Sequence, residues 1–272
     1  MSALVFTLKE EPPQRCDLSP LSPDRLAASS APIEGIEIQT TKRRLCVGDI
    51  FAVTPGDPVD VRFEGGSERF DYVGMGMMRG RIAITGDLGQ QAGRAMSGGE
   101  IVVTGSVGRL AGSGMRGGRL EVGGNAGDLL GGALPGEMSG IRGGIIRVRG
   151  DAAERAGDRM RRGLIVIEGS AARYAASRML GGTMVCFGRA GPRPGYLMKR
   201  GTVLLAGGAD EITPTFVETG VHELVAMRLI ARWLIDERIE GGSALAFTLR
   251  RLMGDTATLG IGELFLPAES GA

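Results

Sequence analysis

A glycine-bounded strand pattern recurs through the middle of the chain and restricts its fold more than any other feature. Closing glycines follow one another at intervals of 19 residues, except for one interval of 26 between Gly124 and Gly150. One insertion of seven residues therefore interrupts an otherwise strict repeat, and such repeats are typical of solenoids. The seven segments are GRIAITG (80–86), GEIVVTG (99–105), GRLEVGG (118–124), GIIRVRG (144–150), GLIVIEG (163–169), GTMVCFG (182–188) and GTVLLAG (201–207).

Within each segment the third and fifth residues are apolar, as Ile82 and Ile84 are in the first. This alternation predicts short strands with one buried face. A 19-residue unit has room for about three short strands, but a lone unit cannot bury its inner face, so the units must stack. We predict an all-β solenoid, a right-handed parallel β-helix of about seven 19-residue coils.

Two further columns of residues support stacked coils. Short polar residues follow the closing glycines, where their side chains can bond the backbone of a corner. Methionines follow ten residues after the closing glycines, and an unbranched side chain suits uneven interior space. The polar residues are Asp87, Ser106, Asn125, Asp151 and Ser170, and the methionines are Met96, Met115, Met160, Met179 and Met198, with Met138 expected in this role after the insertion.

The outward positions of the strands change character along the stack. In the early coils they are charged, as at Arg81, Glu100, Arg119 and Glu121, and are expected to face solvent. In the late coils they are apolar, and an apolar outer face requires a cover, either the chain's own C-terminal helix or another subunit. We predict a partner interface at Leu164, Val166, Val185, Phe187 and Leu204.

The flanks divide the chain into a mixed N-terminal extension (1–60), the β-helix (61–208) and a C-terminal cap (209–272). A weaker, irregular copy of the repeat at 61–80 is expected to form a terminal, partly degenerate coil. Residues 221–237 have the apolar spacing of an amphipathic helix, and 262–267 resemble a terminal strand. The helix is expected to cap or flank the stack.

Composition limits the kinds of partner, and the cellular compartment, that can be expected for this chain. The net charge of +1 gives no general case for binding nucleic acid or a membrane. Three cysteines without metal-site spacing indicate reduced thiols, and we find no leader and no apolar run long enough to span a membrane. We expect a cytoplasmic protein.

Few residues of this chain could serve in catalysis or in metal binding. The single histidine, His222, is expected to be a surface or capping residue, and one histidine cannot build a histidine-rich zinc site. A G-x-G-x-x-G match at 112–117 lies within the repeat and opens no helix, so it is a weak nucleotide motif. We assign no catalytic and no metal-binding residue. Basic residues gather in the later coils, and solvated corners or ion pairs to a partner are the plainer interpretation.

The repeat resembles a known family. GDLGQQAGRAMSGGEIVVTG (86–105) and GSVGRLAGSGMRGGRLEVGG (105–124) resemble the GXGXG β-helix domain of glutamate synthases and, more closely, the C subunit of formylmethanofuran dehydrogenase. The segments LSPLSPDRLA (18–27) and VGDIFAV (47–53) resemble the N-terminal extension of this C-subunit family. The resemblance continues to about Gly208.

This resemblance implies a non-catalytic structural subunit in one of two settings. The archaeal setting is a tungsten or molybdenum formylmethanofuran dehydrogenase. The bacterial setting is a formyltransferase/hydrolase complex, which moves formyl from formyl-tetrahydromethanopterin to a methanofuran-type carrier and releases formate. The basic residues are nearly all arginine, with only three lysines, which favours the bacterial setting. A glutamate synthase-like β-helix domain remains a further alternative.

In the bacterial setting the resemblance implies three partners: an amidohydrolase-like subunit, a molybdopterin-enzyme-like subunit and a formyltransferase subunit. Zinc and the methanofuran-like carrier are then expected in those subunits. Because the carrier has a polyglutamate tail, we hypothesise that Arg159, Arg161 and Arg162 contact that anionic tail.

Overall fold

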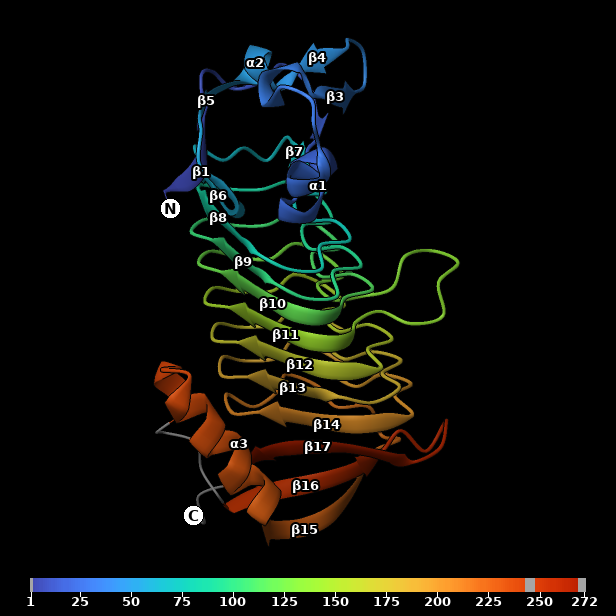
Figure 1. The fold of residues 1–272 in the computed structure, drawn as a ribbon. Helices are drawn as coiled ribbons and strands as arrows, with labels where there is room; N and C mark the ends of the chain where they lie inside the picture. Colours follow the sequence, from blue (N-terminus) through green and yellow to red (C-terminus); the bar gives the residue numbers. More distant parts are fainter. Residues whose placement is uncertain (1, 243–247, 269–272) are drawn as a thin grey trace.

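The computed structural model describes residues 2–242 and 248–268, which form a parallel β-helix with an extension at each end (Figure 1). One 13-stranded sheet runs the length of the molecule in the order β15-β16-β17-β14-β13-β12-β11-β10-β9-β8-β6-β1-β5. Its central strands are β6 (Asp57–Glu64), β8 (Arg81–Thr85), β9 (Glu100–Val103), β10 (Arg116–Val122), β11 (Arg142–Val148), β12 (Arg162–Ile167), β13 (Thr183–Cys186) and β14 (Arg200–Leu205).

The coils stack in register, as the repeat predicted. Leu120 lies opposite Ile101 on one neighbouring strand and opposite Ile146 on the other, with all three side chains buried. A second column of parallel bridges joins the corners, from Ser67–Leu88 down to Ala190–Ala209. The alternating apolar residues therefore form one continuous interior, and the predicted β-helix is confirmed.

The methionine column fills this interior, with one correction. Met96, Met115, Met160, Met179 and Met198 are fully buried. Met138 is 79% exposed, so its predicted place in the column is wrong. Ile141 occupies that place, because its carbonyl accepts from Arg161 N at 2.9 Å just as Met115 O accepts from Arg142 N at 2.7 Å. The inserted residues leave the stack before Ile141 and return at it.

The weaker copy at 61–80 forms a coil that keeps the strand and the methionine of the repeat but departs from it at one corner. Val61 pairs with Ile82 and Phe63 with Ile84, and Met77 is fully buried in the methionine column. The irregular spacing comes from the turn that holds β7 (Phe70–Asp71), which pairs with β2 (Cys16–Asp17). The coil thus keeps the strand register of the repeat while one of its corners is lengthened.

The N-terminal extension closes one end of the stack. Strand β1 (Ala3–Leu8) pairs parallel with β6 and antiparallel with β5 (Phe51–Thr54). Phe6 stacks on Phe63 with ring centroids 5.0 Å apart, so the extension shares the interior of the coils. The remaining elements are η1 (Ser19–Leu21), α1 (Pro23–Ala28), η2 (Ile33–Gly35), β3 (Glu37–Thr40), β4 (Leu45–Cys46) and α2 (Val47–Ile50).

The C-terminal region closes the other end. Strand β17 (Ile261–Pro267), predicted as 262–267, pairs parallel with β14, and β16 (Thr248–Gly254) and β15 (Val217–Glu223) follow antiparallel. Helix α3 (Val225–Asp236) begins four residues later than predicted, because 217–223 pair with β16. Helix α3 is followed by η3 (Glu240–Gly242). Within the described residues, no helix is long and apolar enough to cross a membrane.

Helix α3 covers the apolar outer face of the late coils (Figure 1). Val166, Val185 and Leu204 are fully buried against Met227, Ala231 and Leu234 of the helix. Phe187 is half-buried beside the same cluster. The predicted partner interface is therefore wrong for Val166, Val185 and Leu204, because the chain itself supplies their cover. Leu164 also lines an open hollow.

Candidate functional site

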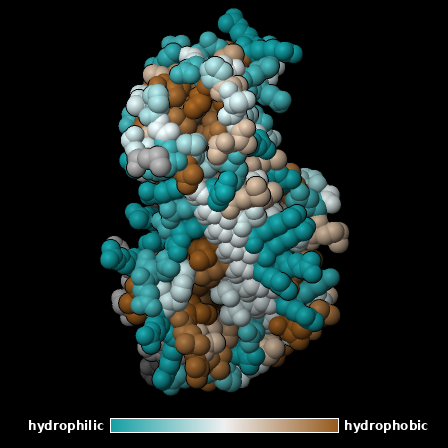
Figure 2. Space-filling view, viewed as in Figure 1, coloured by the Kyte–Doolittle hydropathy of each residue, from teal (hydrophilic) through white to brown (hydrophobic). Residues whose placement is uncertain are grey.

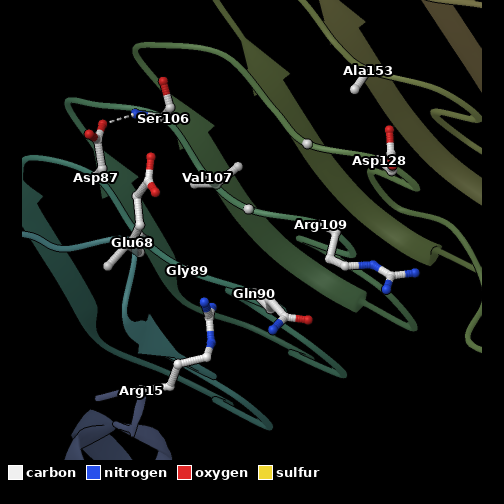
Figure 3. A pocket seen from close by; sticks show the side chains of 13 residues that line it. Arg15, Glu68, Asp87, Gly89, Gln90, Ser106, Val107, Arg109, Asp128 and Ala153 are labelled. Atoms are coloured by element: carbon white, nitrogen blue, oxygen red, sulfur yellow. Dashed lines mark hydrogen bonds between the residues drawn. The ribbon is translucent and has the colours of Figure 1, made fainter. Parts of the chain in front are cut away.

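An open groove follows the corners of the early coils (Figure 3). It encloses about 610 Å³, and Asp87, Gln90, Ser106, Arg109 and Asp128 are among its lining residues. Arg15 reaches it from the N-terminal extension, where its Nε donates to Asp71 Oδ2 at 2.6 Å. The groove thus carries both signs of charge, without a single dominant sign that would select an anion or a cation.

The polar side chains of this edge link one coil to the next. Ser106 N donates to Asp87 Oδ1 at 2.7 Å, the bond drawn in Figure 3, and Asn125 N donates to Ser106 Oγ at 3.0 Å. The ladder continues through Asp151 N to Asn125 Oδ1 and Ser170 N to Asp151 Oδ1. The predicted corner role of these residues is confirmed, with the bond reaching the neighbouring coil. The Ser106 hydroxyl accepts the bond from Asn125 N, which gives it a structural role in this ladder.

The thiols and the histidine lie apart from this groove or are buried. Burial raises the pKa of the Cys16 thiol to about 11 and that of Cys186 to about 12, which disfavours the nucleophilic thiolate. His222 lies on β15, with Nε2 3.1 Å from Thr219 O. Across residues 2–242 and 248–268 no three His, Cys, Asp or Glu side chains gather as a metal site would require.

The G-x-G-x-x-G match at 112–117 is a corner of the coil. Gly112 has a φ of +68°, and a Cβ there would lie 2.3 Å from Ile146 Cδ1 in the interior. This glycine is required by the turn and by close packing, which accounts for the motif without a nucleotide.

A column of cations runs along the edge where the strands begin, and we name it the basic ridge. Arg142 and Arg162 occupy paired positions at the starts of β11 and β12, and both are exposed. None of the ridge cations makes an ion pair within the described chain. Its members are Arg116, Arg142, Arg161, Arg162, Lys199 and Arg200. Like charges at paired positions repel, so the ridge favours an anionic partner.

Of the three arginines predicted to contact a carrier tail, two belong to this ridge and one is engaged elsewhere. Arg161 and Arg162 are exposed. Arg159 is half-buried, and its Nη1 donates to Glu137 O at 2.8 Å in the inserted loop. The role predicted for the three residues stays a prediction.

The inserted loop projects from the stack between β10 and β11 (Figure 1). Arg94 Nη2 donates to Glu137 Oε1 at 2.8 Å, and Leu134 N donates to Glu137 Oε2 at 3.3 Å. Burial raises the pKa of Glu137, but these bonds outweigh it and hold that pKa below its usual value. Sequence reasoning missed this anchor, because 43 residues separate Arg94 from Glu137.

A second hollow, which we name the apolar notch, lies between α3 and the first residues of β11, β12 and β13. It encloses about 370 Å³. Figure 2 shows an apolar strip on the lower part of the face seen there, with a pale band and then hydrophilic side chains to its right. Gly144, Ile145, Gly163, Leu164, Thr183, Leu229, Ile230 and Trp233 line the notch.

No family model matches this chain. A curated protein of Methylorubrum extorquens, described as the C subunit of the formyltransferase/hydrolase complex Fhc, is 54% identical over 57 residues, which are 21% of this chain and 22% of that protein. The matched stretch thus spans only about a fifth of that relative.

The fold comparison extends over nearly the whole chain. It matches a chain in the X-ray crystal structure of the formyltransferase/hydrolase complex (FhcABCD) from Methylorubrum extorquens in complex with methylofuran. The TM-score is 0.93 and the identity 42%, covering 97% of this chain and 100% of that one. Of the settings left open by the sequence, both relatives come from the bacterial one. The chain therefore belongs to the family of C subunits of formyltransferase/hydrolase complexes.

Proposed function

We propose that this chain is the structural C subunit of a formyltransferase/hydrolase complex, with the reacting groups held by its partners. The observation that carries the proposal is the 42% identity, at a TM-score of 0.93, to a complete chain of the FhcABCD complex. The proposed reaction moves formyl from formyl-tetrahydromethanopterin to a methanofuran-type carrier and then releases formate by hydrolysis.

The partners that we propose are an amidohydrolase-like subunit, a molybdopterin-enzyme-like subunit and a formyltransferase subunit, with zinc in a partner. The described residues of this chain do not fit zinc, because its only histidine lies on β15 and no cluster of three ligand side chains accompanies it. The chemical steps are therefore proposed to take place in the partner subunits. Its continuous, capped sheet suits a rigid surface on which other subunits are placed.

Native purification of the tagged chain from its own cells tests this function. We expect an amidohydrolase-like and a formyltransferase subunit to be recovered with it in fixed proportion. Deletion of the chain is expected to remove hydrolase activity from the extract, and re-expression to restore it. Recovery of the chain alone, with full activity in the deletion strain, would contradict the proposal.

The carrier-tail contact is a finer part of the proposal. A polyglutamate tail carries a row of carboxylates, and Arg161 and Arg162 offer exposed guanidinium groups without an ion pair in the described chain. Arg159 would need to release Glu137 O to take part. Charge reversal at Arg161 in the intact complex is expected to weaken binding of the carrier. Unchanged carrier affinity in complexes of normal composition would remove Arg161 from the carrier site.

A further inference from the structure

The apolar notch exists because helix α3 carries more apolar surface than the sheet beneath it buries. Met227, Ala231 and Leu234 face the sheet and are buried. Leu229, Ile230 and Trp233 lie to one side of that row, and Leu229 is 64% exposed. A helix whose apolar arc extends past its own support marks a contact with something else.

The floor of the notch is shaped to receive a side chain. Ile145 and Leu164 lie at paired positions on β11 and β12 and form an apolar base. Gly144 and Gly163 lie directly before them and present no side chain, so the hollow stays open toward the strand starts. At about 370 Å³ the notch can accept one bulky apolar side chain of a protein segment.

The charges that border the notch indicate which partner group lies beside the inserted apolar side chain. Arg162 directly precedes Gly163, and Arg142 lies two residues before Gly144, so the basic ridge borders the notch. Arg142 Nε donates to Ser139 Oγ at 2.9 Å, and the Arg142 charge contributes to lowering the pKa of Glu137, whereas Arg162 makes no ion pair with a carboxylate of the described chain. A carboxylate placed between them would relieve their mutual repulsion and accept hydrogen bonds from both.

We propose that the notch and the two arginines form one docking site for another subunit of the complex. That subunit inserts a bulky apolar side chain between α3 and the strands, and it places an Asp or Glu against Arg142 and Arg162. This inference rests on the proposed function, since it requires a multi-subunit assembly. The partner surface then lies at the open edge of α3, beside the strand face that this helix buries.

Single substitutions in the co-expressed complex test the site. Leu229→Asp puts a charge at the exposed side of the notch, and Arg142→Glu reverses the bordering charge. Val225→Asp is the matched control, because Val225 is 73% exposed on the same helix and does not line the notch. Melting of each isolated variant checks that the fold is intact.

We expect Leu229→Asp and Arg142→Glu each to lower recovery of one partner subunit about tenfold at equal bait, a size typical of a central interface residue. Val225→Asp is expected to recover partners as the wild type does. Normal recovery with both variants would overturn the docking site while leaving the proposed function intact. Variants that lose only carrier binding, or only self-association, would overturn the docking site as well. A wild-type chain that recovers no partner would instead refute the proposed function.

Discussion

Arg119 of β10 is joined to Glu237, directly after helix α3, by two hydrogen bonds of 2.7 and 2.9 Å. Arg147 of β11 donates from Nη1 to Glu237 O and from Nη2 to Arg238 O. It therefore supplies hydrogen-bond donors to two carbonyls at the end of the helix. The end of a helix leaves carbonyls unsatisfied and carries partial negative charge. Outward arginines of two coils therefore fix the end of the helix that covers the late coils.

The first prediction concerns the strength of this anchor. Arg119→Ala is expected to lower the free energy of unfolding by about 1–2 kcal/mol, because it leaves a half-buried carboxylate without its two bonds. A double-mutant cycle with Glu237→Gln should give a coupling of about 1 kcal/mol. The pair Arg81–Glu100 is the control, with 48% and 39% of its side chains exposed, and should couple by less than about 0.5 kcal/mol. Equal coupling in the two pairs would contradict the anchor.

The second prediction is the pH dependence of the same contact. The hydrogen bond from Arg119 holds the pKa of Glu237 below its usual value. A carboxyl whose pKa is lower in the folded state stabilises the fold above its unfolded pKa and loses that contribution as the pH falls. The stability difference between wild type and Glu237→Gln should thus be constant near neutrality and shrink below about pH 4.5. Urea unfolding across pH 7 to 3 measures it, and a difference that grows in acid would refute the assignment.

The third prediction separates the two kinds of methionine. Met115→Ala removes a fully buried side chain from the interior and is expected to cost about 2–5 kcal/mol. Met138→Ala changes a side chain that is 79% exposed, so its effect should stay within about 0.5 kcal/mol. Thermal or urea unfolding of the two variants checks this. A large loss at Met138 would mean that the inserted loop packs against the stack.

The methionines also show how far the sequence could predict the fold. Period-two alternation and a constant interval placed the strands correctly, because each coil repeats the same contacts with its neighbours. The interval alone could not tell whether Met138 or Ile141 rejoins the column, since both are apolar and an insertion shifts the count. The backbone hydrogen bond from Arg161 N of the next coil to Ile141 O decides for Ile141.

Contacts distant in sequence account for what the pattern could not predict. Arg119 was expected to face solvent, yet its partner Glu237 lies 118 residues away. The apolar outer strand positions correctly required a cover, but a repeat cannot show whether that cover is its own helix or another chain. His222 fell in a predicted helix, and the pairing of β15 with β16 overrode the local helical spacing there.

The fourth prediction uses the thiols as reporters of the fold. With pKa values of about 11 for Cys16 and about 12 for Cys186, roughly one Cys16 in a thousand is ionised at pH 8, and fewer at Cys186. Both side chains are also fully buried, whereas Cys46 is half-buried. A thiol reagent at pH 8 should label Cys46 first in the native chain, and all three cysteines in urea.

Labelling of Cys186 in native buffer then requires opening of the late coils. The variant Cys46→Ser should show almost no rapid reaction, while Cys186→Ser should react as the wild type does. Arg119→Ala, which loosens the helix over the outer face of that coil, is expected to speed labelling of Cys186 more than that of Cys16 at the other end of the stack. Equal acceleration at both thiols would show that the coils open only as one unit, rather than locally beneath α3.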